Sequence, residues 1–393
     1  TRSGRVTGVQ TCALPISMSE KYLFRPYKTG DEEKIPELLS TVFKGWPHID
    51  TDLSPIDFWK WKYHKNPVHP GYVSVGFNGD QLISCHHNMV LKIWIQDKAI
   101  YGGTALDFAV HPDYRGQGLS SKTSAQTKIQ RKKDQAIFSY FITRNPKLIK
   151  KFTGTKEQPT KTPRFPFDIL NLTKINDVDL HFRKIPVQNQ ALIKPGIQAL
   201  KAWSKIKGAP KTESNLTVEY TDKFDNKIDP LLEKIIKEHK FMVIRSSTYL
   251  NWRYAYPGLG DYIKLVVKEK DRILGYSVLR INNYNQDYPI GYIVDLITEK
   301  GREDAVSVLV SKAVEYFESK DVNIVNCQLV KGHPYIKVLE RYGFLDSRIK
   351  INLFTTNPEQ GLSLEGLSNA DPSQIYISWG DHDALPVGLN PHT

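Results

Sequence analysis

The sequence contains few cysteines. Only Cys12, Cys85 and Cys327 occur among its 393 residues, and no two of them form a C-x-x-C pair. A disulfide framework needs paired cysteines, and a thiolate metal site needs clustered ones. The sequence therefore argues against both, and it favours a reducing compartment. We expect a cytoplasmic protein without a metal.

Long apolar runs are also missing. No stretch approaches the roughly 20 apolar residues that a membrane-spanning helix needs, so we expect no membrane partner. Residues 1–17, which precede Met18, lack the apolar core and the cleavage pattern of a secretory signal. The segment VTGVQTCALPI resembles a translated sequencing-adaptor oligonucleotide. We therefore predict that residues 1–17 are a non-native leader, and we leave them out of the fold.

Acidic residues are fewer than basic ones. The 42 Asp and Glu face 54 Lys and Arg, which gives a formal charge of +12. Such a balance favours polyanionic partners. The basic residues are dispersed along a chain that is also rich in Asn and Ile, so we interpret the excess as compositional and expect no nucleic acid. The length is too great for one ordinary core, and it predicts two domains.

From Met18 onward, strand and helix signals alternate. A strand over YLFRPY precedes a helix over DEEKIPELLSTVF, and a second helix begins at Ser54-Pro55. Two strands then meet at Asn78-Gly79-Asp80, a strong hairpin signal. The strand TALDFAV, the helix LSSKTSAQTKIQRKK and the strand AIFSYFIT complete a β-α-β unit. This order predicts an α/β fold with mixed, twisted sheets flanked by helices.

The same order recurs about 190 residues later. FWKWKYHKNPVHPGYVSVGF is echoed by YLNWRYAYPGLGDYIKLVV, and TALDFAV is echoed by GYIVDLI, so Asp107 matches Asp295. We interpret this as a duplicated domain. The predicted boundaries are a first domain at 18–185, a linker helix at 186–213, a second domain at 214–356 and a tail at 357–393.

The aromatic and basic stretch FWKWKYHK has two interpretations. It could stack on sugars or on single-stranded nucleic acid. Because Trp252-Arg253-Tyr254 repeats it in the second half, we favour a core helix whose lysines are solvated.

Residues 109–121, AVHPDYRGQGLSS, lie where a predicted strand gives way to a helix. Glycines at such a turn leave backbone N–H groups accessible at the positive end of the helix dipole, where phosphate oxygens bind. Arg115 adds a guanidinium suited to a diphosphate. The alternative is that Gly116 and Gly118 only make a tight turn. The stretch has neither the GK[ST] of a Walker loop nor a full G-x-G-x-x-G.

LDFAVHPDYRGQGLSS resembles the pyrophosphate-binding motif of the GCN5-related N-acetyltransferase (GNAT) superfamily, R/Q-x-x-G-x-G/A after a strand. Arg115, Gly118 and Ser120 occupy the signature positions, and Ser120 departs from the usual Gly or Ala. HPYIKVLERYGF resembles a late helix-to-strand region of the same superfamily. The chain as a whole is similar to a tandem GNAT-like protein.

The resemblance implies an acyltransferase that uses acetyl-CoA as co-substrate and needs no metal. An acceptor amine on a small molecule, amino sugar or peptide would attack the thioester directly. Backbone groups of one strand segment would pair with the pantetheine arm, and the loop amides would hold the diphosphate. The implied cofactor-binding residues are Phe108, Ala109, Val110, Arg115, Gly116, Gln117, Gly118, Leu119, Ser120 and Asn145.

Two residues are candidates for proton transfer. Asp107 is the candidate base, acting directly or through water, although its match with Asp295 also fits a structural carboxylate. The position where the superfamily often carries a general-acid tyrosine falls near Phe152, which has no proton to donate. Tyr140 is a weak substitute, and solvent is the alternative. Asn145 precedes Pro146 and fits a helix start equally well.

The second half lacks the phosphate cradle. Gly301 and Arg302 are present, but Glu303 and Asp304 would repel phosphates at that helix start, so we predict that this half does not bind CoA. Two other functions stay open. One is a catalytically inactive GNAT-like binding or scaffold protein. The other is a FemABX-like aminoacyl transferase, against which the RGQG cradle argues. The oligomeric state is not predicted.

Overall fold

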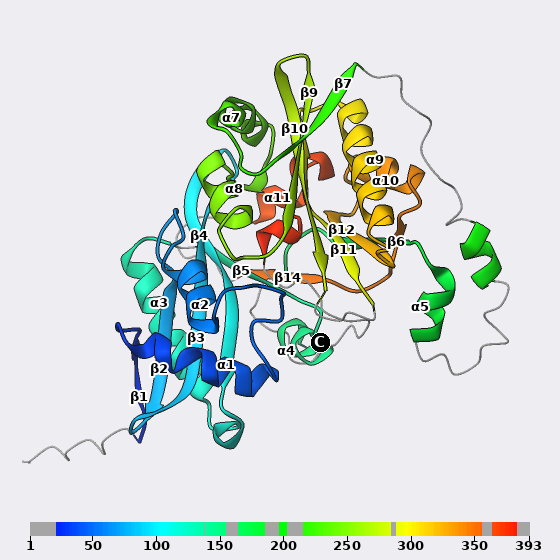
Figure 1. Ribbon diagram of the computed structural model, residues 1–393. Coiled ribbons are helices and arrows are strands. Elements are labelled where there is room, and N and C mark those ends of the chain that lie inside the picture. The colour runs from blue at the N-terminus through cyan, green and yellow to red at the C-terminus, as the bar shows by residue number, and fades with distance from the viewer. Residues whose placement is uncertain are drawn as a thin grey trace, which may run out of the picture.

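A computed structural model describes residues 21–136, 138–154, 164–184, 196–202, 215–283, 288–355 and 364–382 of the chain. The predicted leader at 1–17 and most of the predicted linker at 186–213 lie outside the described residues. Within the described ranges, no helix has both the length and the apolar character needed to cross a bilayer. The fold is α/β, with two mixed sheets flanked by helices, as the sequence predicted (Figure 1).

The first sheet is built mainly from the N-terminal half. Its order is β1-β2-β3-β4-β5-β14, and β8 pairs with β3 at one side. The strands are β1 (Leu23–Pro26), β2 (Tyr72–Asn78), β3 (Gln81–Ile95), β4 (Lys98–Val110), β5 (Phe138–Thr143), β8 (Phe241–Val243) and β14 (Asn352–Thr355). The predicted hairpin at Asn78-Gly79-Asp80 is confirmed, because β2 and β3 pair antiparallel on either side of it.

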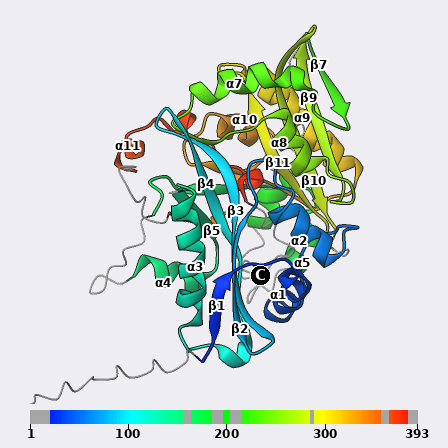
Figure 2. The same ribbon diagram turned by 90° about the vertical axis from the view of Figure 1, so that its left-hand side faces the viewer.

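Helices cover both faces of the first sheet. Figure 2 shows α3 on one face and α1 and α2 on the other. These helices are α1 (Ile35–Phe43), α2 (Pro55–Tyr63) and α3 (Leu119–Lys133), and α4 (Pro146–Thr153) follows β5. Short 3₁₀ turns lie at Asp31–Glu33 and Pro112–Tyr114. Ser54 caps α2 by accepting the backbone N–H of Asp57 at 3.1 Å, and Pro55 occupies the first turn, so the predicted helix start is confirmed.

The second sheet repeats this plan. Its order is β13-β6-β12-β11-β10-β9-β7. The strands are β6 (Ile169–Ile175), β7 (Leu216–Thr221), β9 (Tyr262–Glu269), β10 (Arg272–Asn282), β11 (Ile290–Thr298), β12 (Ile324–Val330) and β13 (Leu345–Asp346). The helices of this half are α5 (Val178–Lys184), α7 (Asp229–Lys237), α8 (Ser247–Tyr254), α9 (Glu303–Ser319), α10 (Tyr335–Arg341) and α11 (Glu365–Ser368), with 3₁₀ turns at Asn226–Ile228, Pro372–Gln374 and Trp379–Asp381.

Each sheet contains at least one strand from the other half, and β8 of the C-terminal half pairs with β3 in the first sheet. β4 pairs in parallel with β5 in the first sheet, and β11 pairs in parallel with β12 in the second. The strand beside β5 is β14, which comes from the C-terminal half. The strand beside β12 is β6, which lies within the range predicted for the first domain. Each sheet therefore needs residues from both predicted domains.

Equivalent helices of the two halves meet at the junction. The rings of Trp61 on α2 and Trp252 on α8 stack with centroids 5.3 Å apart. Each indole N–H donates to the other residue's backbone carbonyl, at 2.9 and 3.1 Å. The two residues lie 191 positions apart, which is the offset of the sequence repeat. Repeated residues thus make a reciprocal contact close to a pseudo-twofold axis between the halves.

Candidate active site

The end of β4 is the centre of the candidate site. Its pairing with β5 covers Gly102 to Thr104 and ends at the pair Thr104 and Tyr140, although β4 continues to Val110 and β5 to Thr143. Past this point β4 is paired with β3 on its other side. Phe108 is 41% exposed there, whereas its neighbour Ala109 is buried. The strand end is therefore accessible in the region that the sequence predicted for a pantetheine arm.

The loop after β4 leads into α3 through left-handed glycines. Gly116 and Gly118 have φ of +78° and +70°, a region that disfavours side chains, and a Cβ at either position would have open space around it. Gly118 is the N-cap of α3. No acceptor within the described ranges bonds the backbone N–H groups of residues 116–120. Several N–H groups thus stay available at the positive end of a 15-residue helix.

Polar side chains surround this loop. The exposed Arg115 donates from Nε to the Val110 carbonyl oxygen at 3.3 Å. Gln117 accepts a hydrogen bond from the Tyr22 hydroxyl at 2.9 Å. The Oδ1 atom of Asn145 accepts the backbone N–H groups of Lys147 and Leu148 and so caps α4. Asn145 therefore starts a helix, which was one of the two predicted interpretations of that residue.

Asp107 lies at a bulge of β4, where its φ is +44°. Its Oδ2 accepts hydrogen bonds from Lys62 Nζ and from the Tyr63 hydroxyl, both at 2.6 Å. Its Oδ1 accepts the indole N–H of Trp46 at 3.0 Å. The Asp107 side chain is 13% exposed and that of Lys62 is 0% exposed. The carboxylate is thus held in place, and part of it still faces outward.

These contacts set the charge of Asp107. Burial is the largest influence and works to raise the pKa of the carboxyl. Lys62 and the donated hydrogen bonds outweigh it, so the pKa lies below its ordinary value. Asp107 is therefore ionised at neutral pH.

His87 holds the backbone of the bulge through hydrogen bonds of its two ring nitrogens. Its Nε2 is 2.9 Å from Trp59 Nε1, and its Nδ1 is 2.9 Å from the Asp107 carbonyl oxygen. The indole nitrogen only donates, so Nε2 is the acceptor and Nδ1 carries the proton. Burial lowers the pKa of His87 to about 4. A neutral histidine therefore fixes the backbone at the position from which Asp107 projects.

Tyr140 and Phe152 lie in packed surroundings. The Tyr140 hydroxyl donates to the Asp381 carbonyl oxygen at 2.7 Å, and the side chain is buried. Burial raises the pKa of Tyr140 well above its ordinary value. Phe152 packs its ring against Phe141 and Phe354. Tyr140 thus ties β5 to the C-terminal segment of the chain.

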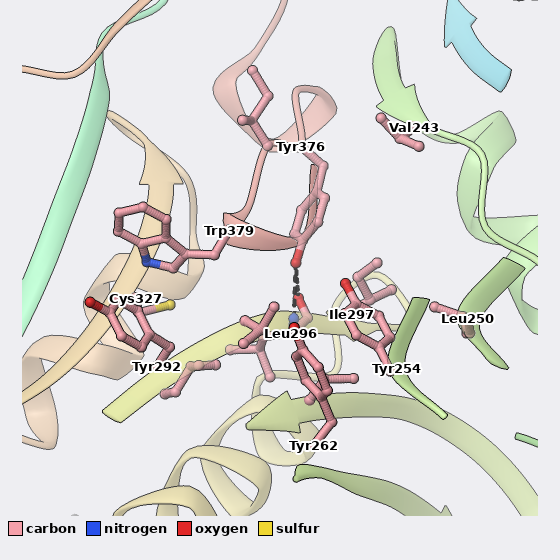
Figure 3. Packing of buried hydrophobic residues seen from close by; sticks show 14 of the residues in the cluster. Val243, Leu250, Tyr254, Tyr262, Tyr292, Leu296, Ile297, Cys327, Tyr376 and Trp379 are labelled. Atoms are coloured by element: carbon pink, nitrogen blue, oxygen red, sulfur yellow. Dashed lines mark hydrogen bonds between the residues drawn. The ribbon is translucent and has the colours of Figure 1, made fainter. Parts of the chain in front are cut away.

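The corresponding strand end in the second half is closed by its own chain. Leu296, which matches Phe108, is 1% exposed. Its N–H donates to the Tyr376 hydroxyl at 2.9 Å, and that hydroxyl lies 2.8 Å from the Leu296 carbonyl oxygen, as Figure 3 shows. Two residues further on, the N–H of Thr298 donates to the Tyr335 hydroxyl at 3.1 Å. Side chains thus occupy this backbone edge.

Asp295, the match of Asp107, is locked in a buried network. Arg245 donates to Asp295 Oδ2 and to Asp381 Oδ1, both at 2.8 Å. The Tyr276 hydroxyl donates to Asp295 Oδ2 at 2.8 Å. Burial raises the pKa of Asp381 to about 6, against the opposing effect of Arg245. Asp295 and Arg245 are almost completely buried, which gives Asp295 a structural setting that Asp107 does not share.

Comparison with known proteins agrees with this geometry. Residues 24–153 match the family model of the acetyltransferase (GNAT) domain. These residues form a GNAT domain. The matched range includes β4, the glycine loop, α3 and β5. No curated protein matches the sequence.

Solved structures extend the likeness in fold beyond the GNAT domain. A probable N-acyltransferase from Enterococcus faecalis is 12% identical with a TM-score of 0.56, and the match covers 85% of this chain and 72% of that one. Saccharomyces cerevisiae N-myristoyltransferase, solved with myristoyl-CoA and inhibitors, is 10% identical with a TM-score of 0.58, at 93% and 88% coverage. A GCN5-related N-acetyltransferase from Anabaena variabilis is 11% identical with a TM-score of 0.55, at 84% and 72% coverage. The likeness in fold to these structures thus extends over both halves.

The sequence analysis missed the residues around Asp107. The expectation that the lysines of FWKWKYHK are solvated is wrong for Lys62, whose side chain is fully buried against Asp107. The signal was the repeat itself, because Lys62-Tyr63 corresponds to Arg253-Tyr254, and a cation and a tyrosine recur in both halves. Trp46 lies between α1 and α2, outside any motif, and only the folded structure brings it to Asp107.

Proposed function

We propose that the protein is an N-acyltransferase that transfers the acetyl group of acetyl-CoA to a primary amine of a small molecule, an amino sugar or a peptide. The observation that carries this proposal is the set of N–H groups of residues 116–120, which have no acceptor in the described parts of the chain. They lie at the start of α3, directly after an accessible strand end. A diphosphate is the ligand that such an arrangement favours.

The cofactor would lie along the end of β4. The backbone of Phe108, Ala109 and Val110 would pair with the amides of the pantetheine arm, and the loop N–H groups with Arg115 would hold the diphosphate. On this course the thioester would lie near the bulge at Asp107. In the second half, Tyr376 and Tyr335 bond the equivalent backbone, which supports a single cofactor site per chain.

Asp107 would act on the attacking amine. As the nitrogen attacks the thioester carbonyl, positive charge develops on it, and an ionised carboxylate in contact with it stabilises that charge. The proton then leaves through Asp107 or a water molecule. Only Trp46 donates to Oδ1 among the described residues, so a carboxylate lone pair remains for the amine. Because Tyr140 donates to Asp381, we propose that solvent protonates the departing thiolate.

Calorimetric titration with acetyl-CoA tests the proposal. The wild type is expected to bind one equivalent, and Gly118→Glu is expected to abolish binding, because it places a carboxylate against the phosphates. Gly301→Glu is the matched control. Gly301 also has a positive φ, +79°, with open space around it, and it also precedes a helix. The backbone strain is thus similar in both variants, and Gly301→Glu should bind normally.

Catalysis needs a second measurement, the release of free thiol when a library of primary amines is added with acetyl-CoA. If acetyl-CoA binds but no amine releases thiol, the protein is the inactive binding protein that the sequence left open. If acetyl-CoA and longer acyl-CoAs all fail to bind, the proposal is wrong.

A further inference from the structure

The segment between α1 and α2, residues 44–54, brings Trp46 to Asp107. The indole N–H of Trp46 donates to Asp107 Oδ1 at 3.0 Å, and Trp46 is 8% exposed. Oδ1 is the oxygen that the proposed function leaves open to the amine. The segment forms no helix or strand between Phe43 and Pro55. Contacts with other parts of the chain must therefore hold it in place.

The second half supplies hydrogen bonds to this segment. Arg280 on β10 donates from Nη2 to Asp50 Oδ1 at 2.9 Å and also to the Asp50 carbonyl oxygen. The hydroxyl of Thr51 donates to the Gly258 carbonyl oxygen at 2.7 Å, and the N–H of Asp52 donates to the same oxygen at 2.9 Å. Three consecutive residues of the segment are thus bonded to the half that we expect not to bind CoA.

The site of Arg280 is shaped for this contact. Its side chain is 0% exposed, whereas that of Asp50 is 36% exposed. The guanidinium lies 4.5 Å from the ring centroid of Tyr262, and its Nη1 donates to the Leu259 carbonyl oxygen at 3.1 Å. A Cβ at Gly260 would lie 2.6 Å from Arg280 Nη2 and 2.7 Å from the Asp50 carbonyl oxygen, so only glycine leaves room for the bond. Because a buried cation is costly without partners, Arg280 needs Asp50.

The two halves share this arrangement. The segment between α7 and α8 carries Arg245, which donates to Asp295, the match of Asp107. The first half holds that segment, because β8 within it pairs with β3 and the N–H of Ile244 donates to the Lys92 carbonyl oxygen at 2.7 Å. In each half, the segment that bonds the aspartate at the bulge is therefore held by the other half. The recurrence points to one shared role for these contacts, which is to place the donor to the aspartate.

We propose that Arg280 is a positioning residue for acyl transfer, which holds Trp46 against Asp107 through Asp50 and the segment 44–54. The inference rests on the proposed N-acyltransferase function, and it gives the second half a part in the reaction of the first. The described hydrogen bonds of Arg280 go to Asp50 and Leu259, and none goes to the loop after β4. Its loss should therefore lower kcat and leave the affinity for acetyl-CoA unchanged.

The first readout needs no turnover. It is the indole N–H resonance of Trp46 in the full chain, assigned from its loss in Trp46→Phe. Asp107→Asn removes the charge of the acceptor and should shift this resonance, which calibrates it as a reporter of the bond. We expect Arg280→Met to shift it as well, and Arg280→Lys to restore most of the wild-type position, because a lysine keeps the cation for Asp50.

Two further variants complete this test. Thr51→Val removes one hydroxyl bond to Gly258 without removing a buried charge, so it should fold and should shift the Trp46 resonance by a smaller amount. Lys240→Met is the control, because it breaks another contact between the halves, the bond to Asp97 at 2.7 Å. It should leave the resonance unchanged. If neither Arg280→Met nor Thr51→Val shifts the resonance, the inference is wrong, whatever the protein catalyses.

The second readout is thiol release. Trp46→Phe and Arg280→Met should each lower kcat about tenfold, which corresponds to one hydrogen bond to a charged group. Because Arg280 acts through Trp46, the double variant should be no slower than Trp46→Phe alone, whereas independent effects would multiply. A multiplied loss refutes the positioning role. If no amine releases thiol from the wild type, the proposed function fails, and the resonance alone decides whether Arg280 places Trp46.

Discussion

The ends of β4 and β11 are equivalent in the two halves, but the end of β4 is accessible and the end of β11 is closed by side chains. Both strands bulge next to an aspartate, both pair in parallel with the following strand, and both lead towards a long helix. At the end of β4 the residue after the aspartate is exposed, and the loop N–H groups have no acceptor in the described structure. At the end of β11 two tyrosine hydroxyls bond the backbone.

The comparison suggests a physical rule by which one half could keep the proposed binding site while the other half supports it. Backbone groups at a strand end must find partners. When the chain supplies them, as Tyr376 and Tyr335 do, the strand end becomes part of the core. When it does not, the groups remain for a ligand. The aspartates follow the same division, because Asp107 keeps a partly exposed oxygen and Asp295 is enclosed by Arg245 and tyrosines.

The largest expected effect is a difference in kcat between variants of the two aspartates. Asp107→Asn removes the charge that stabilises the attacking nitrogen, so kcat should fall about 100-fold or more while acetyl-CoA binding is retained. Asp295→Asn should lower stability and leave kcat unchanged. Steady-state thiol release with calorimetric binding measures both. Equal losses of kcat in the two variants would show that the halves do not differ in this way.

The second effect is a difference in unfolding free energy between variants of the two buried cations, Arg245 and Lys62. Arg245→Met leaves the carboxylates of Asp295 and Asp381 buried without their cation, and it should lower the free energy of unfolding by about 3–5 kcal/mol. Lys62→Met should cost less, because Asp107 keeps Tyr63, Trp46 and solvent. Urea unfolding of both variants provides the test. A larger loss for Lys62→Met would show that the contacts of Asp107, and not those of Asp295, contribute more to the free energy of unfolding.

The third effect concerns the tyrosine that closes the second strand end. Tyr376→Phe leaves the N–H of Leu296 buried without its acceptor, which should cost about 1–3 kcal/mol of unfolding free energy. Tyr22→Phe, which removes a partly exposed hydroxyl bond to Gln117, should cost less. The stoichiometry of acetyl-CoA should stay at one in both variants. A second equivalent bound by Tyr376→Phe would show that the hydroxyl alone blocks a latent site.

The smallest effect is a change in pH dependence. His87 has a folded pKa of about 4, below its ordinary 6.5, so the unfolded chain takes up a proton first and stability falls as the pH drops from about 6.5 to 4. His87→Val removes the imidazole and leaves a side chain that does not titrate. It should reduce this slope by up to about 1.4 kcal/mol per pH unit. Unfolding curves at pH 7 and pH 5 provide the measurement, and an unchanged slope would contradict it.

Most of the fold followed from local signals in the sequence. The helix predicted over LSSKTSAQTKIQRKK is α3, with the same bounds. The strand exchange could not be predicted, because β6 and β14 carry the same strand pattern whichever sheet they join. Pairing over such distances depends on packing of the whole chain and leaves no local trace.

The part of the candidate site that is contiguous in the sequence could be predicted. The part that is formed by residues far apart in the sequence was missed. The glycine loop is contiguous, so its residues could be read directly from the motif. The partners of Asp107 come from α2 and from the segment before it, 44 to 61 residues away. Burial of Lys62 contradicts its usual solvated state, and only the charge of Asp107 makes it tolerable.

The exchange of β6 and β14 has a consequence for synthesis of the protein. β14 comes from residues 352–355, so β5 has no neighbour on that side until almost the entire chain has left the ribosome. An unpaired strand edge attracts other strands, and nascent chains that carry one are prone to aggregate. Premature termination anywhere before residue 352 would thus yield an unclosed first sheet, and cells that make this protein gain from shielding that edge during translation.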